Sequence, residues 1–312
     1  MKFKTTAIAM AVAGSVATPL AVQAGSGELY ASARVGAWNV DEGGASNLEV
    51  RSFDSRFGAQ GETDLGNGLN GFGHYEWNVD LNNDSGASTI SARHRYVGLK
   101  GDFGSVLLGK TYHTFYNFVV GAIDIPWWHA GYAMVNYRSR TDKGITYAGG
   151  IDAFKFGVTA YMTPDAEEED IDEFEAGLSF GIGDITIGGA WQSTETTQGS
   201  TGTDDDIIGI IVSGITAGPV NMGFGAQGQD DDRSFAADIG VADSYYHLEI
   251  LHLDGDSRGV SDRDRISHTL GYTQSLGRKT TMWYELNYID NDTGDSDDDR
   301  TAVMAVLKYD II

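Results

Sequence analysis

The chain of 312 residues contains no cysteine, only four prolines and few basic residues. Without cysteine there is no disulfide, no thiolate metal site and no cysteine nucleophile. The 21 Lys and Arg face 45 Asp and Glu, which gives a net charge of −24. A polyanion of this strength repels phosphate, so nucleic acid is excluded as a partner. The 42 glycines and the 11% of aromatic residues nevertheless favour an ordered chain of strands and tight turns over a disordered one.

Long apolar runs are also missing. No stretch approaches the 18 consecutive apolar residues that a membrane-spanning helix needs. The N-terminus has instead the features of a secretory signal peptide: Lys2 and Lys4 precede an Ala-rich run, and Val22-Gln23-Ala24 resembles a cleavage site. We expect cleavage after Ala24, which divides the chain into a signal peptide (1–24) and an exported domain (25–312). The removed segment carries two lysines and no acid, so the exported domain would have a charge of −26.

After residue 25, apolar side chains recur at every second position. In 220–227, for example, Val220, Met222, Phe224 and Ala226 alternate with polar residues and glycine. Successive side chains of a strand point to opposite faces, so each segment has one apolar face. Sixteen such segments of about 9–11 residues are predicted. They begin near Glu28, Val50, Asn70, Ile90, Ser105, Lys143, Ala153, Asp172, Ile185, Asp206, Val220, Arg233, Ser244, Asp264, Lys279 and Arg300.

The connections between the later segments are of two kinds that alternate. Short Gly-containing ones, such as 181–184 and 217–219, take turns with longer acidic ones at 164–170, 195–206, 229–232, 254–264 and 290–299. A β-sandwich has no reason to separate its loops in this way, whereas an outer-membrane barrel has short turns at one rim and long loops at the other. Sixteen strands would also enclose a water-filled lumen. We therefore predict an all-β fold, a sixteen-stranded antiparallel transmembrane β-barrel.

Several segments are also similar in sequence to a known family. "SRFGAQGETDLGNGLNGFGHYEW" (55–77), "RYVGLKGDFGSVLLGKTYHTFY" (95–116), "GELYASARVGAW" (27–38) and "RTDKGITYAGGIDAFKFGVTAY" (140–161) resemble strands of the general diffusion porins of Gram-negative bacteria. The resemblance covers the whole exported domain and is most specific in its first half. It implies an outer-membrane homotrimer of sixteen-stranded barrels, each a channel with its third long loop, loop 3, folded inward.

In this family a row of arginines on the barrel wall faces carboxylates on loop 3. The resemblance places Arg34, Arg56, Arg93 and Arg140 in that basic wall, with Lys110 as a weaker member, and Asp124 on loop 3. The alternation supports the arginines, because Arg34 shares its face with Ser32 and Gly36. The alternative is that these arginines only pair with wall acids such as Asp54 and stabilise the strands.

Aromatic residues gather in the same loop. Tyr112, Phe115, Tyr116, Trp127 and Trp128 would either line the pore as a stacking track for sugars or aromatic compounds, or pack the loop against the wall. Six further tyrosines are predicted to lie in the outer aromatic girdles at the membrane interfaces: Tyr30, Tyr96, Tyr246, Tyr272, Tyr288 and Tyr309.

The acidic loops have three interpretations. They are a solvated exterior, or they bind Ca²⁺ or Mg²⁺ and bridge to anionic lipopolysaccharide, or they concentrate cations at the channel mouth. We expect the channel to prefer cations, whether the acidic loops are only solvated or also bind Ca²⁺ or Mg²⁺. No other cofactor is predicted.

No sequence motif indicates an enzyme. The seven histidines form no HExxH or other ligand spacing, and no serine motif suggests a nucleophile elbow. Three functions are left: a porin for passive diffusion of small hydrophilic solutes and ions, a substrate-selective porin for a sugar or an aromatic compound, and a non-conducting surface β-barrel or adhesin.

Overall fold

The computed structural model describes residues 25–80, 89–130, 140–141, 143–162, 173–193, 206–254, 263–291 and 299–312. The expected signal peptide lies outside these residues, as does most of each of the acidic connections 164–170, 195–206, 254–264 and 290–299, so these predictions are not tested by the fold.

Eighteen strand segments form one sheet, and each segment pairs antiparallel with its neighbours. The segments are β1 (Ser26–Glu42), β2 (Ala45–Ser52), β3 (Ser55–Gly66), β4 (Leu69–Val79), β5 (Ile90–Gly101), β6 (Gly104–Tyr112), β7 (Arg140–Thr141), β8 (Gly144–Ile151), β9 (Phe154–Tyr161), β10 (Glu173–Ile182), β11 (Ile185–Gln192), β12 (Ile207–Ala217), β13 (Val220–Gln229), β14 (Asp232–Val241), β15 (Ser244–Leu253), β16 (Arg263–Gly277), β17 (Thr280–Asp290) and β18 (Arg300–Asp310).

Two pairs of segments are single strands with a break. β2 and β3 pair one after the other with β1, and Asp54 between them has a positive φ of 55°. In the same way β7 and β8 both pair with β6, and Lys143 between them has a φ of 68°. Counting each pair once gives the sixteen strands that the sequence predicts.

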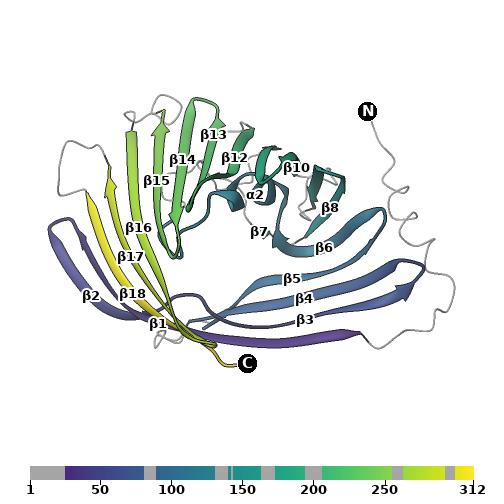
Figure 1. The fold of residues 1–312 in the computed structure, drawn as a ribbon, viewed down its shortest axis with the longest axis horizontal. Helices are drawn as coiled ribbons and strands as arrows, with labels where there is room; N and C mark the ends of the chain where they lie inside the picture. The colour runs from purple at the N-terminus through teal and green to yellow at the C-terminus, as the bar shows by residue number, and fades with distance from the viewer. Residues whose placement is uncertain are drawn as a thin grey trace.

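The sheet closes on itself, because β1 pairs with β18 from Ser32 opposite Asp310 to Glu42 opposite Arg300. Figure 1 shows the strands around the rim of the view, from β3–β5 at the bottom to β12–β15 at the top, with α2 beside β10 and β12. A closed barrel leaves no unpaired edge, which is the condition for a sheet inside a bilayer.

Most predicted strand starts agree with the structure to within a few residues, and two details were wrong. β2 begins at Ala45, ahead of Val50, because Gly43 and Gly44 form the preceding turn with positive φ. The connection 229–232, predicted as a longer loop, is a tight turn, since β13 ends at Gln229 and β14 begins at Asp232.

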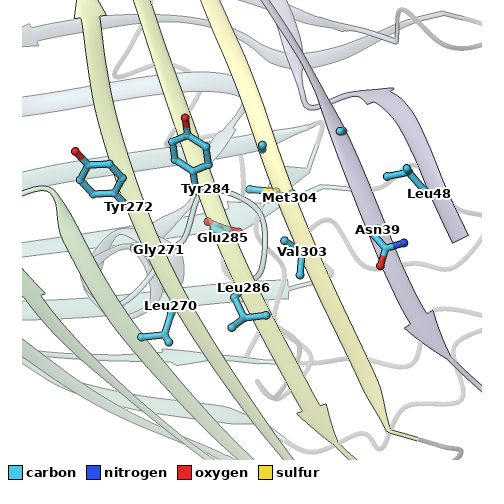
Figure 2. A pocket seen from close by; sticks show the side chains of 12 residues that line it. Asn39, Leu48, Leu270, Gly271, Tyr272, Tyr284, Glu285, Leu286, Val303 and Met304 are labelled. Carbon is cyan, nitrogen blue, oxygen red and sulfur yellow. The ribbon is translucent and has the colours of Figure 1, made fainter. Parts of the chain in front are cut away.

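The two faces of the wall differ in polarity. On β18 the outer residues Val303, Leu307 and Tyr309 are about half exposed, whereas Met304 and Val306 between them are buried. Figure 2 shows part of this outer face, where a hollow of about 460 Å³ is lined largely by apolar side chains such as Leu48, Leu270, Leu286 and Val303. The inner face, by contrast, buries polar groups. Apolar outside and polar inside is the arrangement of a membrane barrel.

This division corrects part of the tyrosine prediction. Tyr272, Tyr288 and Tyr309 are exposed on the outer face. Tyr30 and Tyr96 are not girdle residues, because the Tyr30 hydroxyl donates to the inner-face carboxylate of Glu76 and the Tyr96 ring contacts that of His74. Alternation identifies the two faces of a strand but does not say which tyrosines belong to the outer one.

The segment after β6 enters the barrel. It contains α2 (Thr114–Phe118) and a 3₁₀ turn, η1 (Val120–Ala122), and we call residues 113–130 loop 3. Glycines on the inner wall make room for it: a Cβ at Gly177 would lie 2.8 Å from the Phe118 ring, and one at Gly209 would lie 2.9 Å from that of Phe115. No helix among the described residues is long and apolar enough to cross a bilayer.

Candidate functional site

Four arginines from four different strands meet at one cavity inside the barrel. Arg34 on β1, Arg56 on β3, Arg93 on β5 and Arg140 on β7 line a space of about 420 Å³. The opposite side of this space is loop 3, through Asp124, Ile125, Pro126, Trp127 and Trp128. The strand order brings β1 to β7 side by side, so side chains far apart in sequence stand at the same level of the wall.

The arginines fall into two pairs by their partners. Arg93 Nε lies 2.7 Å from Glu76 Oε1 and Arg93 Nη1 lies 3.3 Å from Asp54 Oδ2, and Arg56 contacts the same two carboxylates at 3.7 and 3.9 Å. Among the described residues, no carboxylate oxygen lies within 4.0 Å of Arg34 or Arg140. The alternative of purely structural ion pairs therefore describes Arg56 and Arg93, while Arg34 and Arg140 leave positive charge at the cavity.

Tyr112 connects the basic wall to loop 3. Its hydroxyl oxygen accepts hydrogen bonds from Arg93 Nη2 and Arg140 Nη1, both at 2.9 Å. Its ring stacks on Tyr116 with a centroid distance of 3.8 Å, and the Tyr116 hydroxyl donates to Asp124 Oδ2 at 2.8 Å. The loop carboxylate is thus fixed in position relative to the arginines.

Asp124 is the loop carboxylate that the sequence predicted, and its side chain is exposed to the cavity. Partial desolvation by the surrounding wall raises the pKa of Asp124, and the hydrogen bond from Tyr116 acts in the opposite direction. Burial and the neighbouring charge of Asp124 raise the pKa of Tyr116, so the phenol remains the donor of this bond.

Strand β17, which is separated from β1 only by β18, holds the tip of loop 3 through one carboxylate. Glu285 on β17 accepts hydrogen bonds from the backbone nitrogens of Trp127 at 2.5 Å, Trp128 at 3.2 Å and His129 at 3.1 Å. His129 Nδ1 lies 2.7 Å from the same carboxylate, and the Tyr245 hydroxyl also donates to it. Glu285 therefore accepts hydrogen bonds from backbone N–H groups at the loop tip that would otherwise be buried without a partner.

Of the aromatic residues predicted to line the pore, some line the cavity and one packs against the wall. Tyr112, Trp127 and Trp128 line the cavity, and Tyr116 stacks beside it. Trp127 also stacks on Trp283 of the wall at 3.8 Å. Phe115 is a correction: it is fully buried against Ile207 and Ile211, because the α2 turn points it into the wall.

Lys110 is a second correction. It is not among the residues that line the cavity, and neither is Arg95, its partner on β5.

Four buried acidic residues of the wall were not predicted from the sequence. Glu175, Asp238, Glu249 and Glu285, on β10, β14, β15 and β17, are buried on the inner face. His247 lies between two of them, 2.5 Å from Asp238 and 3.1 Å from Glu249. The alternation could have identified these residues, because each occupies a position that faces the inside of the barrel. Asp238 and Glu249 lie on β14 and β15, away from the strands β1 to β7 that carry the arginines, and charges of opposite sign on separate parts of the wall produce a field across the lumen.

Comparison with known proteins gives consistent results. The Gram-negative porin family matches residues 5–294. Outer membrane porin PhoE of Enterobacter cloacae is 24% identical over 295 residues, which are 81% of this chain and 84% of that protein.

Solved structures show the same fold. The anion-selective porin from Comamonas acidovorans has a TM-score of 0.72 at 18% identity, covering 92% of this chain and 100% of that one. Salmonella typhi OmpF in complex with daunomycin has a TM-score of 0.71 at 16% identity, covering 91% and 97%. The trimer form of in-vitro folded OmpT from Vibrio cholerae has a TM-score of 0.69 at 15% identity, covering 92% and 100%.

Proposed function

Because this chain belongs to the Gram-negative porin family and is therefore an outer-membrane channel and not an enzyme, we propose that small hydrophilic solutes and ions pass through it by passive diffusion. The observation that carries this is the cavity between the basic wall and Asp124, which is open, polar and bounded by charges of both signs. Such a field orients dipolar solutes and ordered water without making or breaking a bond.

We further propose that the channel prefers cations in dilute salt. The support is the net charge of −24 together with the buried acidic residues of the wall. Arg34 and Arg140, which have no carboxylate within 4.0 Å in the described part of the chain, work against this preference at the constriction. Electrostatic preference of this kind weakens as the Debye length shortens to about 10 Å at 0.1 M salt.

A homotrimer is proposed on two grounds. The OmpT structure is a trimer form, and the outer positions of β1 carry small residues, Ala31 and Ala33, that allow close packing between barrels. Outer-membrane lipid and lipopolysaccharide would surround the assembly. We also retain the cleavage after Ala24, and Ca²⁺ or Mg²⁺ binding by the acidic loops, as proposals; among the described residues, no group of three His, Asp or Glu is placed to hold a metal.

Planar-bilayer recording of the purified barrel tests the function. We expect ohmic conductance steps in KCl, in groups of three if the trimer inserts as a unit. A folded, detergent-soluble barrel that gives no conductance would leave the non-conducting surface barrel or adhesin as the better account.

A further inference from the structure

A continuous row of aromatic side chains runs along the inner wall from the constriction cavity. Tyr116 stacks on Tyr112 at 3.8 Å, and the Tyr112 ring lies 5.3 Å from that of His94. His94 and His74 follow at 5.4 Å, His74 and Tyr96 at 5.5 Å, and Tyr96 and Phe72 at 6.2 Å. We call these six residues the aromatic row: Tyr116, Tyr112, His94, His74, Tyr96 and Phe72.

The aromatic row ends at a second hollow on the inner wall. This hollow, of about 570 Å³, is lined by Phe72, His74 and Tyr96 and by the polar side chains of Glu62 and Lys100. It lies near the short-turn rim, since β3 ends at Gly66 and β5 ends at Gly101. The row therefore joins the constriction to the vestibule at the opposite end from the long loops.

The Phe72 ring lies along the wall instead of standing out from it. A Cβ at Gly98 would lie 2.6 Å from Cζ of Phe72, so this ring covers a glycine of the neighbouring strand β5. The side chains of Phe72, His74 and Tyr96 are all partly exposed. A flat, half-exposed ring offers a stacking surface without blocking the lumen.

Charged groups lie beside the row. Lys100 Nζ is 2.6 Å from Glu62 Oε2 and 5.8 Å from the centre of the Phe72 ring. At the other end, Arg93 and Arg140 hold the Tyr112 hydroxyl. Both ends thus pair an aromatic surface with charges of both signs, which suits a flat ring that carries an ammonium and a carboxylate group.

We propose that the aromatic row is a binding track for planar aromatic solutes with polar or zwitterionic substituents. Successive centroids of the row are 3.8–6.2 Å apart. The partly exposed rings of Tyr112 and His74 lie on either side of the buried His94, so a solute ring that leaves one end of the row meets exposed rings again at the other. This rests on the proposed function, because it requires a conducting lumen. It adds a class of preferred solute to what is otherwise a general channel.

The test compares two zwitterions that differ only in aromaticity, L-phenylalanine and L-cyclohexylalanine, as blockers of the KCl current through single channels. We expect phenylalanine to dwell about two- to tenfold longer in the channel, as stacking contacts of ordinary strength imply. Phe72→Leu and Tyr96→Leu should each bring this ratio towards one. Tyr75→Leu, on the exposed outer face of the same strand as Phe72, is the matched control and should keep it.

The outcomes separate the two proposals. Two results would overturn the aromatic track while the KCl current still supports the channel. One is equal dwell times of the two zwitterions in the wild-type channel. The other is a ratio of dwell times that stays unchanged in both Phe72→Leu and Tyr96→Leu. Absence of any KCl current would instead overturn the proposed function. Because each ratio is measured within one conducting channel, it does not depend on how much of a variant folds.

Discussion

The backbone nitrogen of Trp127 lies 2.5 Å from Oε1 of Glu285, a residue 158 positions later in the chain. This bond and its neighbours at Trp128 and His129 hold the tip of loop 3 against β17, whose Trp283 ring lies 5.5 Å from Cζ of Arg34. A buried carboxylate that does not line the arginine cavity therefore positions the two tryptophans that do.

Replacing Glu285 with Gln should loosen loop 3. A glutamine amide presents N–H donors to loop groups that are themselves donors, so bonds are lost and buried N–H groups are left unpaired. We expect a loss of about 2–4 kcal/mol in the free energy of unfolding, measured by circular dichroism in detergent, and frequent brief closures in single-channel records. Leu286→Ala, at the neighbouring outer position, is the control; equally frequent closures in that variant would argue against the Glu285 contact.

Replacing Asp124 with Asn should shift ion preference. Removing the loop carboxylate leaves the basic wall less opposed, so the ratio of cation to anion permeability should fall about two- to fivefold, as expected for one charge worth about 1 kcal/mol near the permeating ion. Reversal potentials in a dilute KCl gradient measure this ratio. An unchanged reversal potential would remove Asp124 from the constriction.

Acidification should act through the same carboxylate. Because the pKa of Asp124 is raised, its charge is lost at a higher pH than that of an ordinary aspartate, and its contribution to cation preference is present above that pKa and lost below it. Between neutral pH and about pH 4, the wild-type reversal potential should move towards anions. In Asp124→Asn the movement over this range should be clearly smaller, and an identical titration in both proteins would assign it to other groups.

Adding a side chain at Gly209 should detach loop 3 from the wall. A Cβ there would lie 2.8 Å from Cγ1 of Val119 and 2.9 Å from Cζ of Phe115. Gly209→Val should lower the free energy of unfolding by about 1–3 kcal/mol, the usual cost of overpacking, with noisier channel currents. Gly27→Ala, whose Cβ would meet nothing within 4 Å, should match the wild type. Wild-type behaviour of the valine variant would mean that α2 does not pack as described.

The sequence predicted the barrel because alternation is a local property, visible in each strand alone. It also identified Arg34, Arg56, Arg93 and Arg140, which the structure brings to one cavity. It could not predict the partner of the loop tip, since Glu285 reads as one more polar inner-face residue until β17 is placed opposite loop 3. The prediction that Phe115 lines the pore was wrong for a related reason. Whether an aromatic side chain of the loop lines the pore or packs against the wall depends on which glycines of the wall it meets.

We expect ions to pass between the basic wall and loop 3, and cysteine modification at Arg56 tests this path most directly. The chain has no cysteine, so Arg56→Cys introduces the only thiol available to a charged methanethiosulfonate reagent. Adding the reagent during single-channel recording should reduce the current in a step, while Tyr75→Cys on the outer face should show no such step. Complete labelling of Arg56→Cys with unchanged current would contradict this account of the pore.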